Sequence, residues 1–302
     1  MQKKSAFIAI VGVPNVGKSS ILNALLGQKI SIVSPKPQTT RTRIMGILTE
    51  SETQLVFVDT PGMHSPKNQL GRYMEKSIKD SISSVDACLL VVEAGKDLKP
   101  AETELIKKLK RTNLPVILAI NKVDTLKDKS KLMRQISEIS AQIDFLAVVP
   151  LSAKTQDGLD ILLTQLKLTA TQDGHFFPED ELTDQPERVI VAEIVREKIL
   201  QLVDKEIPHG VAICVERMRD RGNTNNLIDI IATVYCEKDS HKGILIGKHG
   251  DMLKKIGSRA RADVERFFDT KVNLQLWVKV KEDWRNRARL LRNFGFDEKD
   301  FT

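Results

Sequence analysis

The chain has 302 residues, of which 41% are hydrophobic and 29% are charged. This composition is typical of a globular protein and excludes a disordered or collagen-like chain. At about 150 residues per domain, the length predicts two domains. Apolar runs are too short for a membrane span or a signal peptide, so a cytoplasmic location is expected. Three cysteines, each within an apolar run, predict buried free thiols.

The formal net charge of +7 is unevenly distributed along the sequence. Residues 241–292 contain 14 Lys and Arg against six Asp and Glu, a net charge of +8. All other residues together carry −1. The excess therefore belongs to one C-terminal segment and predicts an anionic partner for it.

The first part of the chain alternates apolar strands with helices, which predicts an α/β fold of three layers around a doubly wound, mostly parallel sheet. We expect strands at 6–11, 44–49, 54–59, 87–93, 115–121 and 146–151, and helices at 19–26, 70–83, 100–111, 129–140 and 158–168.

A polar stretch then separates two domains, so we expect a first domain at 1–170, a linker at 171–185 and a second domain at 186–302. The second domain is expected to be of the α+β class. Its predicted elements are a helix at 186–206, strands at 211–219 and 227–237, helices at 242–246 and 251–268, a strand at 271–281 and a helix from about 284.

A complete GxxxxGK[ST] motif runs from Gly12 to Ser19, directly between a predicted strand and helix. Backbone N–H groups of such a loop can surround phosphate oxygens, and the helix dipole adds positive potential. Lys18 is expected to reach the β- and γ-phosphates and Ser19 to bind Mg²⁺. Asp59, at a strand end before Thr60-Pro61-Gly62, is expected to hold Mg²⁺ through water, while the Gly62 N–H contacts the γ-phosphate.

The choice of base is predicted by Asn121-Lys122-Val123-Asp124. A carboxylate at Asp124 can accept hydrogen bonds from guanine N1 and N2, which adenine lacks, so an ATP-dependent kinase is disfavoured. Ser152-Ala153-Lys154 is expected to close the site, with the Ala153 N–H near guanine O6. The residues expected to contact the nucleotide are Gly12, Val13, Pro14, Asn15, Val16, Gly17, Lys18, Ser19, Ser20, Asp59, Thr60, Pro61, Gly62, Asn121, Lys122, Asp124, Ser152, Ala153 and Lys154.

These motifs resemble those of the translation-factor class of P-loop GTPases. The resemblance implies that Gln38-Thr39-Thr40-Arg41 is the mobile second motif and that Thr40 binds Mg²⁺. Met63 stands where Ras-like enzymes carry a water-orienting glutamine, and a thioether cannot order water strongly. By similarity to cation-activated families, Asn15 is a K⁺ ligand that aids hydrolysis; the alternative is a loop-stabilising hydrogen bond. Catalytic roles are therefore expected for Asn15, Lys18, Thr40 and Gly62.

The second domain resembles a type II KH domain, with Gly247-Lys248-His249-Gly250 between two helices. This resemblance and the cationic segment predict RNA binding, although a solvated charged face is the simpler alternative. Trp277 could stack on a base, but packing beneath the C-terminal helix is favoured. The residues expected to contact RNA are Ile246, Gly247, Lys248, His249, Gly250, Lys254, Lys255 and Arg259.

The whole chain resembles the Era family of GTPases, on the two-domain order and on Gln38–Arg41, Phe177-Pro178-Glu179-Asp180 and Leu276-Trp277-Val278-Lys279-Val280. The resemblance implies GTP hydrolysis with Mg²⁺, binding near the 3′ end of 16S rRNA, a role in 30S subunit assembly, a monomer, and some peripheral association with the inner membrane. Two alternatives are an RNA-binding scaffold with a structural nucleotide site and a membrane-associated regulatory GTPase.

Overall fold

The computed structural model describes residues 2–36, 38–63, 68–128, 130–222 and 226–296. The chain forms two compact units. The first consists of Met1–Ser31, Thr40–Pro66 and Met74–Asp184, and the second of Ile32–Thr39, Lys67–Tyr73 and Gln185–Thr302. No helix in the described part of the chain is both long and apolar enough to cross a membrane.

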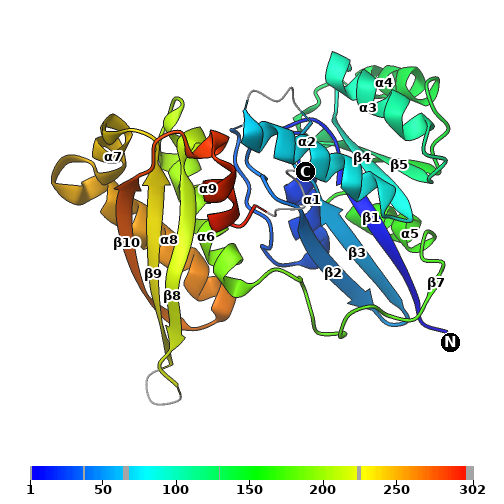
Figure 1. Cartoon of the computed structure of the whole chain (residues 1–302). Coiled ribbons are helices and arrows are strands. Elements are labelled where there is room, and N and C mark those ends of the chain that lie inside the picture. The colour runs from blue at the N-terminus through cyan, green and yellow to red at the C-terminus, as the bar shows by residue number, and fades with distance from the viewer. Residues whose placement is uncertain (1, 37, 64–67, 129, 223–225, 297–302) are drawn as a thin grey trace. The chain divides into compact units, whose positions relative to one another are not determined.

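The first unit is built on a mostly parallel sheet, as predicted (Figure 1). Its path is β2 (Ile44–Glu50), β3 (Thr53–Asp59), β1 (Lys4–Val11), β4 (Ala87–Glu93), β5 (Val116–Asn121) and β6 (Ala147–Pro150). Only β2 on this path runs antiparallel to its neighbour, and the two-residue β7 (Gln172–Asp173) pairs antiparallel with β1.

Helices cover both faces of this sheet and complete the three predicted layers. Alternate residues of β1 enter different cores: Ile8 and Ile10 pack with α1 (Lys18–Leu26) and α5 (Leu159–Lys167). Ala9 and Val11 enter the other core, to which α2 (Gln69–Ser83), α3 (Pro100–Lys110) and α4 (Ser130–Ser140) contribute. The predicted start of the fourth helix at residue 129 lies outside the described residues.

The stretch expected to link the domains is hydrogen-bonded along the first unit as far as Thr183. The side-chain Oε1 of the buried Gln54 accepts the N–H groups of Phe176 (2.8 Å) and Phe177 (3.0 Å). The Thr183 hydroxyl donates to the Met45 carbonyl at 2.6 Å. Most of this stretch therefore adds to the first unit.

The second unit is an α+β module whose sheet order is β10-β9-β8, with β9 and β10 parallel (Figure 1). Helices α6 and α8 share one apolar core with one face of this sheet. The elements are α6 (Glu187–Leu202), η2 (Ile207–Gly210), β8 (Ala212–Asp220), β9 (Leu227–Cys236), α7 (Asp239–Ile246), η3 (Lys248–Gly250), α8 (Asp251–Phe268), β10 (Lys271–Val280), η4 (Trp284–Asn286) and α9 (Ala288–Asn293).

Two expectations for this unit were wrong. Helix α6 ends at Leu202, four residues before the predicted end, because Val203 is extended and Lys205 has a φ of 60°. The expected burial of Trp277 is also wrong, since its side chain is 58% exposed. Trp284 is the buried tryptophan: its Nε1 donates to the Gly210 carbonyl at 2.9 Å, and its ring meets Phe294 edge-on.

Candidate nucleotide site and nucleic-acid interface

The phosphate-binding loop connects β1 to α1 and needs glycine at both ends. Gly12 has a φ of 154° and Gly17 a φ of 102°. A Cβ on Gly12 would lie 2.5 Å from the Val91 carbonyl oxygen, and one on Gly17 would lie 2.1 Å from Asn121 Nδ2. Backbone geometry and neighbouring strands together therefore explain the glycine spacing of the motif.

Lys18 is buried inside this loop. Its Nζ donates to the carbonyls of Gly12 (3.1 Å) and Val13 (3.2 Å). Burial lowers the pKa of the Lys18 ammonium to about 8, against the opposing effect of Asp59. A bound phosphate would supply the negative charge that this buried ammonium favours.

Four oxygen-bearing side chains meet beside the loop, which is where a magnesium ion was expected. Asp59 Oδ2 accepts hydrogen bonds from Ser19 Oγ (2.6 Å) and Ser31 Oγ (2.9 Å), and Ser19 Oγ lies 3.1 Å from Thr40 Oγ1. Asp59 Oδ1 is buried without a hydrogen-bond partner, and burial raises the pKa of this carboxyl. Hard oxygen donors with one unsatisfied carboxylate oxygen fit Mg²⁺, which would take its remaining ligands from phosphate and water.

Gly62 and Met63 follow β3 and lie against the phosphate loop. A Cβ on Gly62 would approach the Pro14 backbone nitrogen to 2.8 Å, so the close approach requires glycine. The Met63 N–H donates to the Gly12 carbonyl at 3.3 Å, and the Met63 side chain packs against an apolar core. Nearby, Thr60 Oγ1 donates to the Ile10 carbonyl (2.8 Å). The thioether of Met63 therefore serves packing.

Asn121 joins the loops at the ends of three strands. Its Nδ2 donates to the Val16 carbonyl at 2.9 Å, which confirms the expected tie to the phosphate loop. Its Oδ1 accepts the Ala153 N–H at 3.1 Å, so this N–H, expected near guanine O6, points to Asn121. Lys122 Nζ donates to the Asn15 carbonyl (2.7 Å) and to Glu93 (2.9 Å). These two hydrogen bonds fix the Lys122 head group against the phosphate loop.

Asp124 lies at the surface beside this loop. The Ser152 hydroxyl donates to Asp124 Oδ1 at 2.7 Å, which orients the carboxylate, and the Lys154 side chain is exposed. The structure thus brings together the four sequence motifs at the carboxyl ends of β1, β3, β5 and β6. In an open α/β sheet this edge is where ligands bind.

Sequence reasoning missed three supporting residues. Ser31 is fully buried and donates to Asp59, and Asn23 Oδ1 accepts the N–H groups of Ile30 (3.0 Å) and Ser31 (2.9 Å). Glu93 holds Lys122. None of these residues belongs to a spaced motif, so only the tertiary structure reveals them.

The segment just before Thr40 belongs to the second unit, where α6 binds it. Glu197 Oε1 accepts the Val33 N–H at 2.9 Å. The Arg196 guanidinium donates to the carbonyls of Gln38 (3.4 Å) and Thr39. Two adjacent residues of α6 therefore hold both ends of this segment.

In the second unit, the Gly247–Gly250 turn separates α7 from α8. Gly247 has φ 76° and ψ 174°, and a Cβ there would lie 2.8 Å from the Met252 backbone nitrogen. Gly250 has a φ of 83° with open space around it, and Lys248 and His249 are exposed. The turn thus presents backbone and a cation to solvent at the start of α8.

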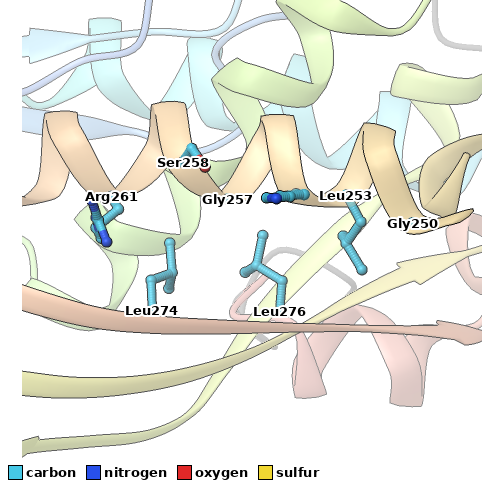
Figure 2. A pocket seen from close by; sticks show the side chains of 8 residues that line it. Gly250, Leu253, Gly257, Ser258, Arg261, Leu274 and Leu276 are labelled. Carbon is cyan, nitrogen blue, oxygen red and sulfur yellow. The ribbon is translucent and has the colours of Figure 1, made fainter.

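A groove of about 380 Å³ continues from this turn between α8 and β10. Figure 2 shows Leu274 and Leu276 pointing from β10 toward Leu253 and Arg261 of α8. An apolar floor with cations at its edge suits unstacked bases and their phosphates. Its lining residues are Gly250, Leu253, Lys254, Gly257, Ser258, Arg261, Leu274 and Leu276.

Of the residues expected to contact RNA, Gly250 and Lys254 line the groove and Lys248 and His249 lie in the adjoining turn. Lys255 and Arg259 are exposed elsewhere on α8, and Ile246 packs against the apolar core. Sequence reasoning missed other lining residues on α8. They follow Gly250 at helical spacing, and this spacing could have been used to find them. These missed α8 residues are Gly257 and Ser258, whereas Arg261 belongs to the cationic segment from which RNA binding was predicted.

A phosphate-loop site with a guanine-type base loop, followed by a KH-like module, defines the class of two-domain P-loop GTPases. Residues 7–122 match a family described as "50S ribosome-binding GTPase", and residues 206–285 match the KH domain. GTPase Era of Ruminiclostridium cellulolyticum is 49% identical over 296 residues, covering 98% of each chain. GTPase Era of Clostridioides difficile is 45% identical over 296 residues, covering 98% of this chain and 99% of the relative. The chain belongs to the Era family.

Solved structures of Era agree with this assignment. Aquifex aeolicus Era bound to GDP and aluminium fluoride is 39% identical, with a TM-score of 0.92 over 97% of this chain and 99% of its own. Era in complex with MgGDPNP and nucleotides 1506–1542 of 16S ribosomal RNA is 38% identical, with a TM-score of 0.93 and the same coverage.

Proposed function

We propose that this chain is a GTP-hydrolysing switch that binds the 3′ region of 16S rRNA and assists assembly of the 30S subunit. One observation carries the proposal: the four nucleotide motifs meet at one sheet edge in a chain that Era relatives match over 98% of its length. The GTP-binding part is 1–170, the connection 171–185 and the RNA-binding part 186–302. The protein acts in the cytoplasm as a monomer, and its cationic segment could also attract anionic lipid at the inner membrane.

The proposed roles follow the contacts in the first unit. Lys18 binds the β- and γ-phosphates, and Ser19, Thr40 and Asp59 hold Mg²⁺, which would neutralise phosphate charge when bound. The Gly62 N–H contacts the γ-phosphate. Asn121, Lys122 and Asp124 position and select guanine.

Catalysis requires a contribution that Met63 cannot make. Asn15 is exposed at the crest of the phosphate loop with a φ of 70°. A K⁺ ion held there by Asn15 would stabilise charge developing on the phosphates.

The contacts of α6 support communication between nucleotide and RNA. Thr40 adjoins the segment that Arg196 and Glu197 bind. Thr40 lies 3.1 Å from Ser19 at the expected Mg²⁺ site while α6 makes these contacts. Release of Thr40 after hydrolysis would free the peptide that α6 holds, so the nucleotide state and α6 become linked.

Single-turnover hydrolysis and RNA affinity test the proposal together. We expect RNA comprising 16S nucleotides 1506–1542 to bind more tightly than a scrambled RNA, with an affinity that differs between GDPNP and GDP. Equal affinities in both nucleotide states and an unchanged hydrolysis rate would instead favour a scaffold with a structural nucleotide. Binding to anionic vesicles that competes with RNA would favour the membrane-associated regulator.

A further inference from the structure

The sheet of the second unit has a second face that carries an exposed tryptophan. Side chains alternate along β10, so Leu274 and Leu276 face α8 while Gln275 and Trp277 face the opposite side. Of the Trp277 side chain, 58% is exposed. An indole exposed to this extent on a regular strand loses the benefit of burial in the free protein. The outer face is this side of the sheet, with Gln275 and Trp277 of β10 and the residues paired with them on β9 and β8.

Polar and cationic groups surround Trp277 on the outer face. Strand pairing aligns Trp277 with Thr233 and Cys214. Two carboxylates in the described part of this face are engaged by neighbours. Glu216 accepts from Thr233 Oγ1 (2.6 Å) and lies 3.6 Å from Lys279 Nζ, and Asp229 pairs with Arg221 (2.6 Å). Five cations lie on the described part of this face, and pairing of Arg221 and Lys279 with the two carboxylates leaves an excess of three positive charges. The cations are Arg217, Arg219, Arg221, Lys271 and Lys279.

The exposed tryptophan and the excess of cations favour one kind of ligand for the outer face over another. A protein partner favours an apolar patch depleted in charge, whereas the neighbours of Trp277 on its strand are Gln275 and Lys279. Single-stranded nucleic acid requires an aromatic face for a base and cations for the phosphates on either side. The charge and the exposed ring both match that ligand.

We propose that the outer face is a second binding surface for single-stranded RNA, on which a base stacks against Trp277 and the flanking phosphates meet Lys279 and Arg217. This inference rests on the proposed RNA-binding function but concerns a site separate from the α8–β10 groove, because the two sets of side chains point to opposite sides of β10. An RNA long enough to pass from one face to the other would gain affinity from both.

Affinity measurements with two RNA lengths test this surface. Trp277→Ala is expected to weaken binding of the 1506–1542 RNA by about five- to a hundredfold, the range for loss of one stacked base. An RNA of about six nucleotides, enough for a KH groove that contacts four, should bind the variant as tightly as the wild type. Trp277→Phe should retain most of the affinity for the long RNA. Met133→Ala on α4, which removes another exposed apolar side chain, is the control and should change nothing.

Two signals report on the surface directly. The chain has two tryptophans, and Trp284 is buried, so quenching of the exposed indole by the long RNA should disappear in Trp277→Phe. Cys214, which is partly exposed and two strands from Trp277 in the same row, should react more slowly with a maleimide when the long RNA is bound.

The outcomes separate the two proposals. If the wild type binds neither RNA, the RNA-binding function itself fails. If Lys254→Ala in the groove weakens both RNAs while Trp277→Ala weakens neither, only the outer-face inference is overturned. Equal loss for short and long RNA in Trp277→Ala would also overturn it, because the substitution would then act through the groove.

Discussion

Ser19 Oγ and Asp59 Oδ2 lie 2.6 Å apart, joining the phosphate loop to the end of β3 by one hydrogen bond. The other oxygen of the same carboxylate is buried without a partner. An unsatisfied buried oxygen costs stability, so the free site favours a cation that would satisfy it. Metal binding and the stability of this part of the first unit should therefore be linked.

Asp59→Asn removes the negative charge at this point. We expect the Mg²⁺ concentration for half-maximal GTP hydrolysis to rise by about 10- to 100-fold, the usual cost of disturbing a metal site. A Mg²⁺ titration of single-turnover hydrolysis measures the shift. Asp97→Asn, at an exposed position away from the loop, is the matched control. An unchanged Mg²⁺ requirement in Asp59→Asn would contradict the assignment.

Asp124→Asn should convert guanine preference to xanthine preference. An amide can donate to xanthine O2 but cannot accept the two guanine N–H donors, so GTP affinity should fall by at least about 100-fold while XTP affinity rises. Ser152→Ala removes only the 2.7 Å hydrogen bond that orients Asp124 and should cost about fivefold, the equivalent of about 1 kcal/mol. Competition of GTP and XTP against a fluorescent nucleotide provides the measurement.

Hydrolysis should be faster in KCl than in NaCl if Asn15 holds an activating cation. Asn15→Ala should abolish this difference while leaving nucleotide affinity within about threefold, since the lost interaction matters mainly in the transition state. Phosphate release at matched ionic strength measures both. Equal rates of wild type and variant in the two salts would assign Asn15 to loop stability.

The two glycines of the turn before α8 should differ in their tolerance of substitution. Gly247→Ala places a Cβ 2.8 Å from a backbone nitrogen in a conformation open only to glycine, so it should lower the melting temperature and weaken RNA binding at least tenfold. Gly250→Asn meets open space in the left-handed region, which asparagine tolerates, and should retain binding. Thermal unfolding and RNA titration of the pair provide the test.

Cys88 should resist alkylation in the folded protein. Burial raises the pKa of its thiol from 9.0 to about 12, so almost no thiolate forms at pH 8. In the unfolded chain this thiol ionises first, so its contribution to stability is complete below about pH 9 and is lost as the pH rises toward 12. Mass spectrometry after iodoacetamide treatment should find Cys214 modified well before Cys88. Equally fast modification of both would show that the first unit opens readily.

Most of the fold could be predicted because its signals are local. The apolar run of β4 and the glycine spacing of the phosphate loop each specify one element and its neighbours. The end of α6 could not be predicted, because Lys36 binds the Val203 carbonyl from a distant part of the chain. The exposure of Trp277 could not be predicted for the same reason: the buried tryptophan is Trp284, whose indole is fixed by the Gly210 carbonyl, 74 residues away.

Some residues of the candidate site could likewise be predicted from local sequence motifs, and others could not. Lys18, Asp59 and Asn121 belong to spaced motifs and were predicted. Ser31, which donates to Asp59, lies outside any motif. Leu274 and Leu276 of β10 line the groove, which the sequence could not show, because strand alternation predicts which side chains share a face but not that a groove opens beside that face.

The single strand β10 forms both the wall of the groove and the outer face, which restricts how this part of the chain can evolve. Each face can accept substitutions independently, because neighbouring side chains point apart. Loss or gain of one residue in the turn at 269–270 would reverse the whole strand and exchange both sets. We therefore expect sequence variation in β10 among functional variants without any change in the length of the turn that precedes it.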